Sequence, residues 1–203
     1  MAVAKPAALE CLDAACWPGI ASVSGGSIAQ APLVVRGVGA LAADMVAQAA
    51  ELLAVVARQA GQDAATTQAE AIRARASALA LSNEVAFTRA SRQIEAARSG
   101  QSGDLTLVQA AASAADVPLR ICQAANDLAL LAAELASGSM SQRSADLCGI
   151  AQLAAGACNA AALLVHANSG LAADDPRRSC AEQTASETFT AAQAMLSTDT
   201  GGR

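Results

Sequence analysis

Aromatic side chains are almost absent from this chain, whose 203 residues include two phenylalanines, one tryptophan and no tyrosine. Apolar residues still make up 54% of the sequence, and alanine supplies most of that fraction. Alanine is the best helix former and is depleted from β-strands. Each residue of an alanine-rich helix face adds little stability when it is buried. The fold must therefore be stabilised by many close helix–helix contacts. The sequence therefore predicts an all-α fold, a bundle of about six helices that forms a single domain over residues 1–203.

Basic charge and long apolar runs are also scarce. The net charge of −5 argues against a nucleic-acid partner, since such proteins need basic surface to neutralise phosphates. Gln, Asp, Glu or Arg interrupts the apolar runs before the roughly 18 residues that a membrane span needs. The segment around Lys5 has no continuous apolar stretch of the signal-peptide kind. We therefore expect a cytoplasmic protein that binds neither membranes nor nucleic acids.

Cysteine and histidine do not form a metal-binding pattern. The six cysteines are scattered without a CxxC pair, and the single histidine, His166, cannot complete a zinc-finger site. Buried free cysteines behave as small apolar residues. The sequence thus predicts reduced cysteines, no metal site and no prosthetic group.

Apolar periodicity and helix-end signals divide the chain into segments. Gly61 fits the position after a helix, and Asp63 fits the N-cap of the next one. Pro118 predicts a kink or break near Asp116. Core candidates after residue 141 are Leu147, Ile150, Leu153, Leu163 and Leu164. Helices are expected at residues 6–15, 31–60, 63–98, 104–137, 141–168 and 176–197, followed by a frayed tail at 198–203.

The run Ser24-Gly25-Gly26-Ser27 precedes a long helix rich in small residues. Two adjacent glycines permit φ > 0 and a close approach to the backbone. Free amides at a helix start can hold an anion or a carbonyl oxygen. Two interpretations stay open, a ligand-binding loop and an ordinary loop in front of a core helix.

Several short fragments occur in an order that resembles a known family. They are Gly-Gly-Ser at 25–27, Ala-Phe at 86–87, Val-Pro-Leu at 117–119, Ser-Ala-Asp-Leu at 144–147 and Val-His-Ala-Asn at 165–168. Over residues 7–175 the chain resembles the cyclodeaminase/cyclohydrolase family, which includes the helical domain of formiminotransferase-cyclodeaminase and stand-alone methenyltetrahydrofolate cyclohydrolases. The resemblance implies an all-α homodimer whose substrate is tetrahydrofolate or a related pterin carrying a one-carbon unit.

The resemblance implies two reactions. One is hydrolysis of the methenyl bridge of methenyl-tetrahydrofolate or methenyl-tetrahydromethanopterin, which a short chain without a formiminotransferase half favours. The other is formimino-folate cyclodeamination. The alternatives are a helical dimer that binds a pterin or a protein but has lost the chemistry, and a purely structural assembly module.

The resemblance also implies which residues bind the substrate. Gly25, Gly26 and Ser27 would supply hydrogen bonds to the pterin or to a developing oxyanion. Asn83 stands where the family has an aspartate, so a proton-accepting carboxylate is missing there. Arg98 stands at a family lysine and could grip a carboxylate. The other arginines of the 63–98 segment are expected to form a solvated face.

Two further family positions, Asp146 and Asn168, lie on one predicted helix. Asp146 is either the general base or pterin-binding carboxylate, or a first-turn aspartate favoured by the helix dipole. Asn168 is either a substrate-binding residue or a helix C-cap. The two residues are roughly 33 Å apart on a straight helix, so only an antiparallel dimer partner could bring them to one site. His166 is either a proton shuttle or a packed residue.

Overall fold

The computed structural model describes residues 31–99, 104–138, 140–169 and 174–200. The chain divides into two units, Met1–Val35 and Arg36–Arg203. Only the start of one helix is described in the first unit, so the fold below is that of the second. The helix expected at 6–15 and the Gly-Gly loop lie outside the described residues.

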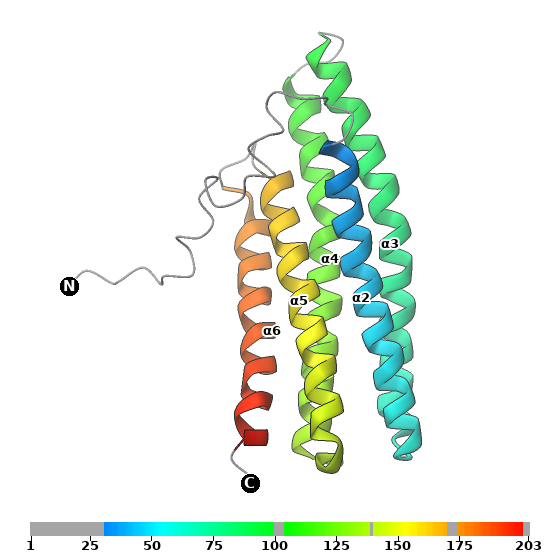
Figure 1. Ribbon diagram of the computed structural model, residues 1–203. Coiled ribbons are helices and arrows are strands. Elements are labelled where there is room, and N and C mark those ends of the chain that lie inside the picture. Colours follow the sequence, from blue (N-terminus) through cyan, green and yellow to red (C-terminus); the bar gives the residue numbers. More distant parts are fainter. Residues whose placement is uncertain (1–30, 100–103, 139, 170–173, 201–203) are drawn as a thin grey trace, which may run out of the picture. The chain divides into compact units, whose positions relative to one another are not determined.

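All regular structure in the described ranges is helical, which confirms the all-α prediction (Figure 1). Five α-helices are described where about six were expected for the whole chain. Helix α6 continues to Thr200, three residues beyond the predicted helix end at residue 197, and the frayed tail stays a prediction. The elements are α2 (Ala31–Gln59), α3 (Asp63–Arg98), α4 (Asp104–Ser137), the 3₁₀ turn η4 (Ser141–Arg143), α5 (Ser144–Asn168) and α6 (Pro176–Thr200).

The turn between α2 and α3 follows the predicted glycine signal. Gly61 has φ 69°, the left-handed conformation that glycine adopts without strain. The Gln62 N–H donates to the Ala57 carbonyl at 2.9 Å, and the Gly61 N–H donates to the Arg58 carbonyl at 3.1 Å. These are the two bonds of a Schellman motif. Asp63 is already the first residue of α3 rather than its N-cap.

Helix α4 lies at the centre of the second unit and packs against α3, α5 and α6. Its contact with α5 is close because small residues meet there. The Cys122 thiol donates to the Cys158 carbonyl at 3.5 Å, and the Cys158 thiol donates to the Cys122 carbonyl at 3.6 Å. The contact with Cys158 and burial raise the pKa of the Cys122 thiol, which keeps it protonated and unreactive.

Two helices contradict the expectation that no segment could span a membrane. By length and composition alone, Gly37–Gln59 and Ser141–Asn168 are each long and apolar enough. Half of the most apolar window in the first is buried within the fold, and 61% of that in the second. Leu153 and Leu163 of α5, expected in the core, are exposed. Both helices thus carry apolar residues on more than the face that packs inside the chain.

Candidate functional site

A groove of about 490 Å³ runs between the C-terminal half of α3 and the N-terminal half of α4. Ala86 and Val117, from two of the family-like fragments, both line it. The groove therefore brings together residues that are 31 positions apart and that the sequence links only through a resemblance. Its other principal lining residues are Leu81, Val85, Arg89, Gln93, Asp116 and Arg120.

The groove combines an apolar wall with cationic groups. Leu81 and Val85 are about 70% exposed, at 71% and 69%, although both are large aliphatic side chains. Arg89 and Arg120 contribute two guanidinium groups, which can bind carboxylates or phosphates through paired N–H donors. The arrangement suits a ligand with a flat or apolar body and an anionic tail.

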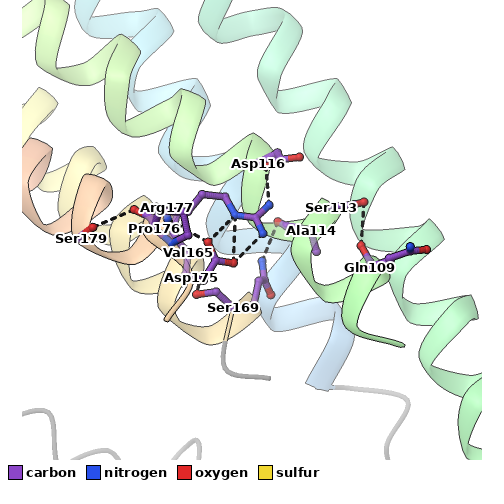
Figure 2. A network of polar contacts seen from close by, with 11 residues as sticks. Gln109, Ser113, Ala114, Asp116, Val165, Ser169, Asp175, Pro176, Arg177 and Ser179 are labelled. Atoms are coloured by element: carbon purple, nitrogen blue, oxygen red, sulfur yellow. Dashed lines mark hydrogen bonds and ion pairs between the residues drawn. The ribbon is translucent and has the colours of Figure 1, made fainter. Parts of the chain in front are cut away.

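Asp116, the carboxylate that lines the groove, is bound by a side chain from the start of α6 (Figure 2). Arg177 donates from Nη1 to Asp116 at 2.7 Å and from Nη2 to Asp175 at 2.6 Å. The Arg177 guanidinium lowers the pKa of Asp175, whose side chain is only 5% exposed, and Asp175 raises the pKa of Arg177. Asp175 and Arg177 therefore stay charged near neutral pH, and the contacts of Arg177 with Asp175 and Asp116 join the start of α6 to α4.

Asn168 has a structural partner at the same end of α4. Its Nδ2 donates to the Ala114 carbonyl at 2.9 Å. In an unbroken helix that carbonyl would accept from the N–H of residue 118, but Pro118 has no N–H. Asn168 thus replaces the missing donor. This hydrogen bond joins the family-like fragment at 165–168 to the turn of α4 that precedes the fragment at 117–119.

This bond also corrects two predictions. Helix α4 continues through Pro118 without the predicted break, because the proline is fully buried and the Ala114 carbonyl, which the proline leaves without a donor, accepts from Asn168 of α5. A kink near Asp116 stays a prediction. Ser169, not Asn168, is the C-cap of α5, and its backbone N–H donates to the Val165 carbonyl. A substrate-binding role for Asn168 stays a prediction.

His166 is held by two side chains of α6. Arg178 donates from Nε to Nδ1 at 3.3 Å, and Nε2 lies 2.8 Å from Glu182 Oε1. Because arginine can only donate, Nδ1 must be the accepting nitrogen and Nε2 must carry the proton. The geometry fixes one neutral tautomer and favours the packed interpretation over the proton shuttle.

Asn83, at the position of the family acid, faces α2 rather than the groove. Its side chain is 6% exposed, and a Cβ placed on Gly39 would lie 2.6 Å from its amide atoms. Gly39 is therefore glycine because Asn83 occupies the space of a side chain. A carboxylate here would need its own compensating partners at a close helix contact.

Asp146 lies in the first turn of α5, at the opposite end of that helix from Asn168. Its side chain is 62% exposed, and Arg143 is 3.9 Å away, at the limit of an ion pair. The first-turn position fits the helix-dipole interpretation. Nothing in the described chain joins Asp146 to the groove, and its catalytic role stays a prediction.

For the four remaining predicted site residues, the structure describes no side chain. Gly25, Gly26 and Ser27 lie outside the described residues, and Arg98 is the last residue of α3 with its side chain undescribed. Sequence reasoning missed Asp116, Arg120 and Arg177. The sequence Asp175-Pro176 could have indicated this network. An aspartate directly before a first-turn proline is a common N-cap, so it predicts a carboxylate at the start of a helix.

A second groove, of about 540 Å³, lies farther along α3 and α4. Arg75 and Asp127 form an ion pair across it, and its third charged lining residue is an acid, Glu134. It offers no free cationic group comparable to those of the first groove. Within the described ranges, no cluster of three or more His, Cys, Asp or Glu side chains could hold a metal ion.

By sequence, the chain matches no family model and no curated protein. By structure, it is similar to the formiminotetrahydrofolate cyclodeaminase of Thermotoga maritima, with a TM-score of 0.66. The two chains share a fold. The match covers 78% of this chain and 82% of the Thermotoga protein at 20% sequence identity. The cyclodeaminase-like fold expected from the ordered fragments is therefore confirmed.

Proposed function

We propose that the chain is an enzyme of one-carbon metabolism that acts on a reduced pterin, by hydrolysing the methenyl bridge of methenyl-tetrahydrofolate or methenyl-tetrahydromethanopterin. Formimino-folate cyclodeamination is the related reaction of the same substrate class. The observation that carries the proposal is the fold shared with a formiminotetrahydrofolate cyclodeaminase over 78% of the chain. The ordered family-like fragments support it independently.

The α3–α4 groove supplies the substrate site of this proposal. Arg89 and Arg120 would bind the acidic tail of a folate, and Leu81 and Val85 would cover part of its ring system. Asp116 would accept an N–H of the ring or orient water, since one oxygen is held by Arg177 and the described residues provide no second partner. Asp146 remains the candidate general base from the family resemblance, and a cytoplasmic homodimer remains the expected state.

The test follows the decay of the methenyl chromophore spectroscopically, with both methenyl compounds. We expect catalysed decay by the wild type and about a tenfold or greater loss of kcat/KM in Arg120→Met, as for loss of one charge-assisted contact. Arg73→Met is the matched control, because Arg73 lies on α3 but pairs with Glu51 of α2 outside the groove. No decay above buffer with either compound contradicts the proposal.

A second candidate function is pterin binding without chemistry. Two observations favour it, the amide of Asn83 at the family acid position and the engagement of Asp116 by Arg177. Calorimetry distinguishes the two functions. Binding of tetrahydrofolate without turnover, weakened by Arg120→Met and unchanged by Asp146→Asn, supports the binder and rules out the enzyme.

A further inference from the structure

The side of α3 that faces away from the core carries two large aliphatic side chains. Leu81 is 71% exposed and Val85 is 69% exposed, the two highest values among the large apolar residues that the structure describes. At 100° per residue, both lie about 140–180° around the helix from the buried residues Asn83 and Ala90. Packing within the described chain does not account for them, and adjacent exposed aliphatic groups can mark a binding surface.

Arginine side chains without a partner gather next to this pair. Within the described ranges, Arg89, Arg92 and Arg120 form no hydrogen bond or ion pair, although the net charge of the chain is −5. The other arginines whose side chains are described each have a partner, and they are Arg58, Arg73, Arg75, Arg143, Arg177 and Arg178. The unpaired positive charge of the described chain is thus concentrated at one place, where a bound anionic group would neutralise it.

The surface of α3 at this place has the form of a ridge beside a groove. Side chains four residues apart form continuous rows along a helix. One row, which we call the α3 ridge, consists of Leu81, Val85, Arg89 and Gln93. The next row consists of Glu84, Thr88 and Arg92. A recess of about 470 Å³ lies between the two rows and is lined by residues of both. The α3 ridge also borders the α3–α4 groove, so it lies between two hollows.

This surface shape fits a helix as the bound partner. Two helices pack most often by placing a row of side chains of one, four residues apart, into the groove between two such rows of the other. Amphipathic helices bind protein grooves through anchor residues spaced by one or two turns. A second helix could therefore place one of its rows in the recess beside the α3 ridge.

The two ends of the recess favour different side chains of that helix. Val85, with Leu81 beyond it, offers aliphatic surface at one end. Arg89 and Arg92 offer guanidinium groups at the other, and these bind carboxylates through paired N–H donors. Val85 and Arg92 are about 10 Å apart along α3, which is about two helical turns. The recess therefore fits a helix that carries an aliphatic residue and, about two turns away, a glutamate or an aspartate.

We propose that the α3 ridge and the adjoining recess bind an acidic amphipathic helix of another protein, with its aliphatic residues on Leu81 and Val85 and its carboxylates on Arg89 and Arg92. This docking surface does not depend on the proposed function, because Thr88 and Arg92 line the recess and not the substrate groove. Arg89 lines both hollows, so Arg92 is the arginine that distinguishes the two proposals.

Fluorescence anisotropy with labelled helical peptides tests the proposal in the full chain. The probe is a peptide of repeated Leu-Glu-Ala-Leu-Ala-Glu-Glu heptads, and its counterpart has lysine in place of every glutamate. We expect saturable binding of the acidic peptide and at least about tenfold weaker binding of the basic one. Arg92→Gln should weaken binding of the acidic peptide at least about tenfold, as for loss of a hydrogen bond between charged groups.

Arg73→Gln is the matched control, because it removes the same charge from α3 at a side chain that pairs with Glu51. We expect this variant to bind the acidic peptide as the wild type does. Leu81→Ser tests the aliphatic end and should weaken binding at least about threefold, because less apolar surface is buried. Turnover of the methenyl compounds should be unchanged in Arg92→Gln, so failure of the docking proposal and failure of the enzymatic proposal are distinguishable.

Other results overturn the proposal. Absence of saturable binding up to about 1 mM, or equal binding of the two peptides, would exclude an acidic partner helix. Equal weakening by Arg92→Gln and Arg73→Gln would show attraction by net charge alone. Loss of self-association in Val85→Glu, measured by sedimentation, would assign the surface to a second copy. Partition into phosphatidylglycerol vesicles that Arg92→Gln abolishes would assign it to a lipid surface.

Discussion

The outward faces of α4 and α5 have similar lengths and opposite chemistry. The α4 face alternates acids, bases and amides, while the exposed residues of α5 between Asp146 and Asn159 are only Gly149, Leu153 and Gly156. The exposed residues of α4 include Asp116, Arg120, Gln123, Asp127 and Glu134, and those of α5 include Gly149, Leu153, Gly156 and Leu163. The two helices thus expose different surfaces, with polar and charged groups on α4 and small or aliphatic residues on α5.

The difference shows how an alanine-rich chain can specify two kinds of contact. Inside the fold, α4 and α5 are alike, because cysteine and alanine let their backbones approach. Outside, α4 resembles a solvated helix that can hold an anionic ligand, and α5 resembles the core of an interface.

The largest expected effect concerns the bond that holds α4 and α5 back to back. Asn168→Ala removes the donor to the Ala114 carbonyl and should lower the free energy of unfolding by about 1–3 kcal/mol, the cost of an unsatisfied buried group. In a Pro118→Ala background, the restored N–H of residue 118 can bond that carbonyl. The cost of Asn168→Ala should then fall by at least about half in a double-mutant cycle.

Chemical denaturation measures both values, and Gln152→Ala serves as a control because its donor on α5 bonds α6 instead. An equal cost of Asn168→Ala in both backgrounds would show that Asn168 does not substitute for the proline N–H.

A smaller effect concerns the network behind Asp116. Because Arg177 lowers the pKa of Asp175 in the folded state, the ionised carboxylate stabilises the fold above its unfolded pKa of about 3.9. This contribution is lost as the pH falls through the lower, folded pKa. Asp175→Asn should therefore be less stable than the wild type at neutral pH, and the difference should shrink below about pH 4.

Thermal unfolding between neutral and acidic pH provides the measurement, with the exposed neighbour variant Asp174→Asn as control. The same pH profile for Asp175→Asn and the wild type would mean that the ion pair does not stabilise the start of α6. The start of α6 would then be less ordered than the ion pairs of Arg177 indicate.

Much of the fold could be predicted from the sequence because helix-end signals are local. Gly61 marked the turn between α2 and α3, and the bounds of α3 and α4 follow from residues next to them. The break predicted at Pro118 is wrong because the donor that replaces the missing N–H comes from Asn168, 50 residues away. No local rule can supply such a donor.

The candidate site was less predictable, for the same reason. Asp116 and Arg120 become site candidates only in the folded chain, where Arg89 lines the same groove and Arg177 of α6 contacts Asp116. Leu153 and Leu163 were assigned to the core because helical periodicity detects an apolar face but cannot tell whether the same chain covers it. An α5 that is apolar on nearly every side needed the fold before its outward face could be recognised.

The most direct test of the division between the two faces introduces one negative charge on each. Leu163→Glu lies on the exposed face of α5, and Gln123→Glu is its matched control on the exposed face of α4. In sedimentation equilibrium, we expect the wild type and Gln123→Glu to form the predicted homodimer, with twice the mass of one chain, and Leu163→Glu to raise the dimer dissociation constant by about a hundredfold, as burial of an unpaired charge costs several kcal/mol. An unchanged dissociation constant in Leu163→Glu, or an equal increase in Gln123→Glu, would contradict the account.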